Sequence, residues 1–146
     1  MRPAIDGVHH VTFVVDDLVA GIAWFGTVLG AEHRHRFDHH DSEGILFGVV
    51  LELDGFPGMI ELRMATEDYP LPRGYDPVTF QVAGETELEV WREHLDAVGA
   101  AHSPVKRRRT GQSIEFPTPD GVVLRLFTAP AGGFDAVPFQ EQYVDH

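Results

Sequence analysis

The stretch G-V-H-H-V-T-F-V-V, residues Gly7–Val15, decides the fold because its core returns later in the chain. It is rich in β-branched and aromatic residues and precedes two aspartates, which predicts a strand that leads into a helix. Gly74–Val82 reads G-Y-D-P-V-T-F-Q-V, so the pattern V-T-F-x-V occurs in both stretches. An internal repeat of this kind indicates two copies of one supersecondary unit. The first copy has His10 where the second has Pro77.

The composition indicates a folded, acidic chain. It has 146 residues, of which 43% are hydrophobic and 10% aromatic, which is typical of one globular domain. The net charge of −12 argues against nucleic acids and anionic membrane surfaces as partners. Because there is no cysteine, a disulfide scaffold and a thiolate metal site are excluded. Met1–Gly7 has no apolar signal core and Ile45–Leu51 is too short to span a bilayer, so we expect a cytoplasmic protein.

The first copy predicts a strand, a helix and three further strands. A helix is expected over Leu18–Leu29, with an aspartate before it as the N-cap and Gly30 at its end. His39–Gly44 reads as a polar turn. The three strands expected after the helix are Ala31–Phe37, Ile45–Leu53 and Met59–Met64.

The second copy repeats this order. Thr66–Asp76 contains two prolines and predicts a linker, and Val78–Val82 predicts the strand after it. A helix is expected over Glu85–Val98. Three more strands are expected at Ala100–Arg109, Gln112–Phe116 and Val122–Thr128.

The two copies carry the motifs H-H-V-T-F-V-V-D-D-L, W-F-x-x-V-L-G and F-P-T-P-D-G-V-V-L-R-L-F. With them the chain resembles the vicinal oxygen chelate superfamily, the group of glyoxalase I, bleomycin-resistance proteins and extradiol dioxygenases. The resemblance covers Asp6–Phe127. It implies an α+β fold in which two βαβββ modules pair into a curved mixed sheet, a half-barrel cup around one site. The expected single domain consists of module 1 at about 5–65, the linker at about 66–76, module 2 at about 77–128 and a tail at 129–146.

The resemblance also implies where a metal would bind. Metal-dependent members take ligands from the first and last strands of both modules, and the matching positions are His10, Glu61, Pro77 and Arg125. Proline has no donor side chain, and a guanidinium repels a cation. Two donors are fewer than the three or four that a divalent ion needs. We therefore expect no metal cofactor, with His10 and Glu61 as residual ligand positions, and we expect Arg125 to pair with Glu61 instead.

These residues form a candidate catalytic set of His10, Glu61 and Arg125. His10 would move a proton, Glu61 would orient it or share the proton, and Arg125 would stabilise a developing enolate or carboxylate. A purely structural role stays open for each of them. Strand alternation predicts which further side chains face the cup. The candidate substrate-binding residues are Thr12, Met59, Thr79, Gln81 and Phe127.

Three function classes follow from these residues. The first is a metal-independent isomerase, cyclase or lyase acting on a small oxygenated or aromatic metabolite. The second is a non-catalytic protein that sequesters a drug or metabolite, as bleomycin-resistance-like relatives do. The third is a metal-dependent glyoxalase or dioxygenase with an atypical ligand set. A small molecule is the expected partner in each class, and a homodimer is expected from the resemblance.

Two charged stretches have alternative interpretations. His33, His35, His39 and His40 are histidines in one short region, and alternation along a strand would place two of them on one face. No carboxylate is well placed beside them and arginines flank them, so a solvated or pocket-rim strand is favoured over a metal site. The basic run Lys106–Arg109 predicts a charged strand edge, with an anion site as the alternative.

Overall fold

The computed structural model describes residues 1–138. The chain divides into two compact units. The first consists of Met1–Arg73 and Pro119–Gly121, and the second contains Gly74–Thr118 and the described residues from Val122 onward. Among the described residues, no helix combines the length and the apolar character that crossing a membrane requires.

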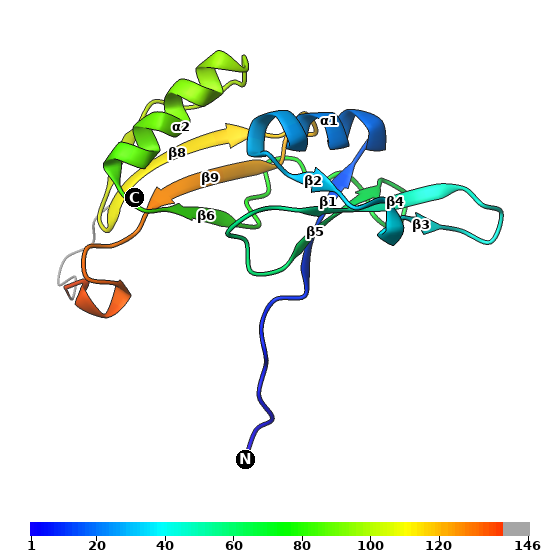
Figure 1. Cartoon of the computed structure of the whole chain (residues 1–146), viewed down its shortest axis with the longest axis horizontal. Helices are drawn as coiled ribbons and strands as arrows, with labels where there is room; N and C mark the ends of the chain where they lie inside the picture. The colour runs from blue at the N-terminus through cyan, green and yellow to red at the C-terminus, as the bar shows by residue number, and fades with distance from the viewer. Residues whose placement is uncertain (139–146) are drawn as a thin grey trace. The chain divides into compact units, whose positions relative to one another are not determined.

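The first unit is a mixed sheet with one helix on it (Figure 1). Its strands follow the order β1-β5-β4-β2, and β3 pairs with β4. β1 and β5 are parallel, and the other pairs are antiparallel. The elements are β1 (His10–Val15), α1 (Leu18–Leu29), β2 (Glu32–His33), β3 (His39–His40), β4 (Leu46–Glu52) and β5 (Met59–Met64).

Alternation along the strands separates two faces of this sheet. Phe13, Val49 and Leu62 are buried and face the apolar side of α1, where removal of their surface from water stabilises the unit. Asp17 caps this helix, because its carboxylate accepts from the N–H of Ala20 at 3.0 Å. The opposite parity places the side chains between these core residues on the other face, away from α1.

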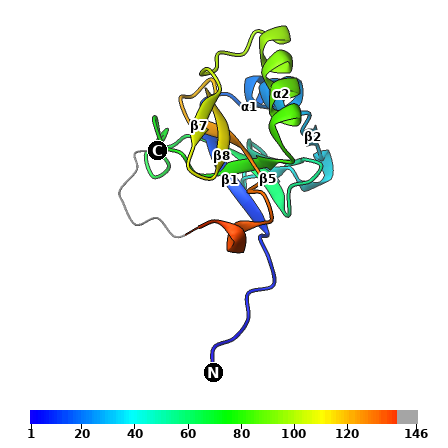
Figure 2. The same ribbon diagram turned by 90° about the vertical axis from the view of Figure 1, so that its left-hand side faces the viewer.

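The second unit repeats this topology with the order β6-β9-β8-β7. β6 and β9 are parallel, and β7 pairs with β8 at the edge of the sheet (Figure 2). The helix α2 packs on β8 and β9. The elements are β6 (Thr79–Val82), α2 (Glu85–Ala97), β7 (Lys106–Arg108), β8 (Gly111–Pro117) and β9 (Val123–Thr128). The expected pair of βαβββ modules in an α+β fold is therefore confirmed.

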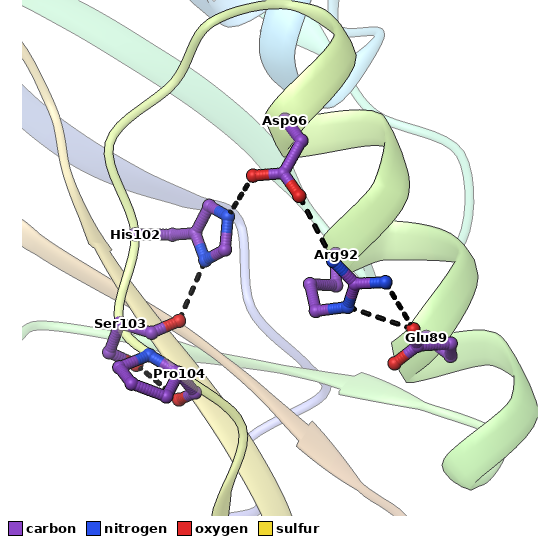
Figure 3. Close-up of polar contacts among 6 residues, drawn as sticks. All are labelled: Glu89, Arg92, Asp96, His102, Ser103 and Pro104. Atoms are coloured by element: carbon purple, nitrogen blue, oxygen red, sulfur yellow. Dashed lines mark hydrogen bonds and ion pairs between the residues drawn. The ribbon is translucent and has the colours of Figure 1, made fainter.

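Polar contacts fasten α2 to the segment that follows it (Figure 3). Arg92 bonds to Glu89 and, at 3.0 Å, to Asp96 one turn further along the helix. The other oxygen of Asp96 lies 2.6 Å from Nε2 of His102. His102 in turn lies 2.7 Å from the carbonyl oxygen of Ser103. The segment is thereby held in place before the sheet resumes.

Three boundaries expected from the sequence are wrong. Ala31–Phe37 is not one strand: β2 has two residues, and a 3-10 helix, η1 (His35–Phe37), follows it. His39–Gly44 is not only a turn, because His39–His40 pairs with β4 as β3. The strand expected over Ala100–Arg109 is shorter and consists of β7, Lys106–Arg108. The first part of the expected range is not a strand, because His102 bonds to α2 and Ser103 bonds to β8. Alternation alone overpredicted the strand length of Ala31–Phe37, and the polar composition of His39–Gly44 concealed a short strand.

Candidate functional site

A buried carboxylate lies on the helix-free face of the first unit. Glu61 in β5 is 8% exposed and lies directly beside Thr12 of β1 in the parallel register. The hydroxyl of Thr12 donates to Oε1 at 3.2 Å, and Nε2 of His39 lies 3.0 Å from Oε2 and donates to it. The guanidinium of Arg63 is 4.0 Å from Oε1. These contacts offset the desolvation of a carboxylate that would otherwise be costly to bury.

His39 reaches Glu61 because its neighbour on β4 has no side chain. The strands place His39 opposite Gly48, and a Cβ on Gly48 would lie 3.0 Å from Cδ2 of the imidazole. The ring also stacks on Phe47 with 5.8 Å between centroids. The His39 side chain remains 38% exposed, so the imidazole is partly accessible from solvent. A carboxylate that orients a partly exposed imidazole is the arrangement of a general acid–base pair.

His39 was not among the catalytic candidates, and His10 has a different environment from the one expected. His10 is exposed at the start of β1, in register with Met59, and its Nδ1 lies 2.9 Å from Nδ1 of His9. Glu61 takes its imidazole partner from β3 instead. The sequence signal for His39 was a buried acid that needed a partner, together with a histidine close before an apolar strand. A catalytic role for His10 stays a prediction.

The second unit contains a pocket of about 290 Å³. Phe80 and Gln81 of β6 and Phe127 of β9 contribute to its wall. Pro130 and Phe134, from the segment after β9, line it as well. The remaining lining residues are Thr79, Thr110, Arg125 and Thr128. Four residues that the sequence analysis selected, Thr79, Gln81, Arg125 and Phe127, therefore gather around one pocket.

The charge of Arg125 is offset inside its own unit. Its Nη2 lies 3.1 Å from Asp76 and 3.2 Å from Glu115, which is its antiparallel neighbour on β8. Glu115 also accepts from Arg108 at 2.9 Å. Two carboxylates thus already face this guanidinium, which lowers the positive potential of the pocket wall. Because Glu61 also has partners in its own unit, the expected pairing of Glu61 with Arg125 stays a prediction.

The chemistry of the four positions that match the superfamily's metal ligands does not fit a divalent ion. Both oxygens of Glu61 already accept hydrogen bonds, and His10 is engaged with His9. Pro77 offers no donor, and Arg125 adds a permanent positive charge.

Comparison with known proteins shows which family and which solved structures this chain is similar to. The sequence model of the Glyoxalase/Bleomycin resistance protein/Dioxygenase superfamily matches residues 7–126. A comparison with curated protein sequences found no match. Solved structures with the same fold include a member of this superfamily from Sphaerobacter thermophilus, with 23% identity and a TM-score of 0.71. That match covers 85% of this chain and 98% of the other.

Two further solved structures have functional names. One is a mutant of FosX, a fosfomycin resistance protein from Listeria monocytogenes, in complex with Mn(II) and 1S,2S-dihydroxypropylphosphonic acid. It is 25% identical, with a TM-score of 0.66 over 85% of this chain and 93% of that one. The other is TnmS3, an antibiotic-binding protein from Streptomyces sp. CB03234. It is 19% identical, with a TM-score of 0.72 over 88% of this chain and 99% of that one.

Proposed function

The chain belongs to the Glyoxalase/Bleomycin resistance protein/Dioxygenase superfamily, and we propose that it binds a small, uncharged, largely apolar organic molecule. The observation that carries this proposal is the pocket of the second unit. Its rings and proline supply apolar contact area, and its threonines and Gln81 supply hydrogen-bonding groups. This is the composition of a typical small-molecule site.

The charges around the pocket favour an uncharged ligand. A free guanidinium would attract a carboxylate or phosphonate, but Asp76 and Glu115 already pair with Nη2 of Arg125 and offset its charge. Its Nε is buried and has no hydrogen-bond partner among the described residues, so a neutral acceptor group of a ligand is favoured there. An anionic ligand would have to displace them or bind beside them. The volume of about 290 Å³ is near the lower limit of ligand pockets, which favours a compact molecule. TnmS3 is described as an antibiotic-binding protein, and binding of such a compound is consistent with this chemistry.

A screen of small neutral aromatic compounds tests the proposal. Binding is detected by a rise in melting temperature and by shifts of backbone amide signals in NMR spectra. We expect Phe127→Ala and Gln81→Ala to weaken each binder about tenfold, because each side chain lines the pocket. Val90→Ala, an exposed change on α2, is the matched control and should leave affinity unchanged. Binders whose affinity is the same in all four proteins would contradict the proposal, and so would a screen that yields no binder.

A second candidate function is metal-independent acid–base catalysis, and the contact of His39 with Glu61 favours it. A buried carboxylate fixes the imidazole while the side chain stays 38% exposed, so a His39 that takes a proton from a carbon or oxygen acid and returns it elsewhere fits this geometry. Proton transfer of this kind is the chemistry of isomerases and lyases. The contribution of His10 that the sequence predicts, which lies in the same unit, would add to it.

Exchange of substrate hydrogens in D₂O tests this second candidate, because it detects proton abstraction without a known product. Small ketones, hydroxy acids and phenols are incubated with the protein, and deuterium incorporation is measured by NMR. His39→Gln should abolish the exchange, whereas His94→Gln, a matched change on α2, should leave it intact. An exchange rate that His39→Gln does not alter would remove His39 from the reaction.

A further inference from the structure

A second polar cluster lies outside the residues used above, at the end of β2. Among the described residues, His33, His35 and Asp38 form a group of three metal-ligating side chains whose donor atoms all lie within 4.8 Å of one another. Nε2 of His33 is 2.7 Å from Oδ1 of Asp38, and Nδ1 of His35 is 3.9 Å from Oδ2. The two imidazole rings face each other with 3.8 Å between their centroids.

The 3-10 helix creates this cluster. If the strand expected over Ala31–Phe37 continued to Asp38, this side chain would point to the face opposite His33 and His35. In a 3-10 turn the side chains at positions i and i+3 lie above one another, which brings Asp38 onto the side of His35. The turn is closed by the N–H of Asp38, which donates to the carbonyl of His35 at 3.1 Å. The missing carboxylate that counted against a metal site is therefore supplied by the local fold.

The neighbouring arginines are directed to other partners. Arg34 bonds to Glu32 at 2.9 Å and to Glu52 at 2.7 Å. The guanidinium of Arg36 lies 4.6 Å above the ring of Phe37. Each positive charge thus has its own acidic or aromatic partner, and the two flanking arginines do not need Asp38 for compensation.

We propose that His33, His35 and Asp38 bind a divalent transition-metal ion of the Zn²⁺ type, with water completing its coordination. Two imidazoles and one carboxylate suit this class of ion. His33 and Asp38 are 12% and 16% exposed and form the pre-ordered half of the site. His35 is 82% exposed and closes over the ion. Tetrahedral Zn²⁺ with ligands at about 2.0–2.1 Å needs donor atoms about 3.3 Å apart, so small side-chain rotations are sufficient.

Calorimetric titration of the full chain with Zn²⁺, after removal of metals with EDTA, tests the proposal. One ion per chain should bind at micromolar concentration. His35→Ala should weaken binding by roughly tenfold or more, because an exposed ligand is lost while the fold is kept. His40→Ala, which removes a nearby exposed imidazole outside the cluster, should bind as the unchanged chain does. The absence of Zn²⁺ binding, or equal affinity in His35→Ala, would overturn the proposal.

Two further measurements distinguish this site from other histidines. Co²⁺ in place of Zn²⁺ should give visible absorption bands that Asp38→Asn weakens. A control variant, His10→Ala with His39→Ala, should retain these bands and the zinc affinity, because neither residue belongs to the cluster. Binding that is lost in this control and kept in His35→Ala would assign the ion to the face around Glu61 and refute the site proposed here. None of these outcomes depends on the small-molecule pocket.

Discussion

The two units place opposite charges at corresponding positions of the same topology. In the first, Thr12 of the opening strand lies beside Glu61 of the last strand, and in the second Thr79 lies beside Arg125. The carboxylate accepts from a hydroxyl and an imidazole, whereas the charge of the guanidinium is offset by two carboxylates that both contact Nη2. The fold thus sets the position of a polar side chain in the sheet. The side chains on the neighbouring strands determine whether an acidic or a basic group is stable at that position.

The difference between the neighbouring strands explains this choice. Beside Glu61 on β4 stands Val50, and beside Arg125 on β8 stands Glu115. Valine cannot balance a carboxylate, so the first unit brings in His39 from the additional strand β3. The second unit balances its arginine directly across β8 and β9. An acid–base pair is therefore possible in the first unit, and an electrically balanced pocket wall is possible in the second.

The largest expected effect comes from removing the acid of the first unit. Glu61→Ala leaves the hydroxyl of Thr12 and the imidazole of His39 without their acceptor and opens a space in a buried position. We expect a loss of about 1–3 kcal/mol in the free energy of unfolding, measured by urea denaturation. Glu67→Ala, a change of the same type at an exposed position, should have little effect. Equal losses in both variants would contradict the buried role of Glu61.

Removal of Arg125, the basic residue of the second unit, should lower the free energy of unfolding less than removal of Glu61. Arg125 is partly exposed, and Glu115 keeps its bond to Arg108. Arg125→Met should lower the free energy of unfolding by about 1 kcal/mol, since Asp76 and Glu115 lose a shared cation. Arg125→Lys should recover part of the loss. The same urea measurement would contradict the ion cluster if Arg125→Met were as stable as the unchanged chain.

Gly48→Ala tests whether the contact of His39 with Glu61 depends on the absence of a side chain at Gly48 in β4. The added Cβ would lie 3.0 Å from Cδ2 of the imidazole and 3.4 Å from the carbonyl oxygen of Leu62. A double-mutant cycle with Glu61→Gln should show coupling of about 0.5–1 kcal/mol, because the second change matters less once the histidine has moved. Gly26→Ala in α1, where the added Cβ has an ordinary contact of 3.5 Å, is the matched control and should not couple to Glu61. If the effects of Gly48→Ala and Glu61→Gln on the free energy of unfolding were strictly additive, this explanation would be contradicted.

The smallest expected effect concerns the helices, which the two units fasten differently. α1 relies on the cap of Asp17, while α2 uses the contact of Asp96 with His102 shown in Figure 3. The hydrogen bond that Nε2 of His102 donates to Asp96 raises the pKa of His102 above its usual value near 6.5. The pair therefore adds stability that is complete below that value and lost as the pH rises through the raised pKa.

The free energy of unfolding, measured across this pH range, tests whether the contribution of His102 is lost as the pH rises. The unchanged chain should lose stability between pH 6.5 and alkaline pH relative to His102→Gln, whose curve lacks this contribution. Val90→Ala, an exposed change on the same helix, serves as the control and should follow the unchanged chain. A difference between the chain and His102→Gln that grows as the pH rises would contradict the assignment.

Much of this molecule could be predicted from the sequence because its signals are local. The repeated V-T-F-x-V stretch, the aspartate before α1 and the glycine after it define the two modules and the first helix. Alternation along β6 and β9 places Thr79, Gln81, Arg125 and Phe127 on one side, and the pocket gathers them. Such features depend on neighbours two to four residues away, which a sequence displays directly.

The partners of the charged groups depended on the tertiary structure. The sequence determined that Glu61 needs a donor and that Arg125 needs an acceptor, since neither charge is stable when buried alone. It could not say that a two-residue strand would carry His39 to Glu61, or that a 3-10 turn would bring Asp38 close to His33 and His35. Short polar segments have weak local preferences, so their conformation is set by the strands against which they pack.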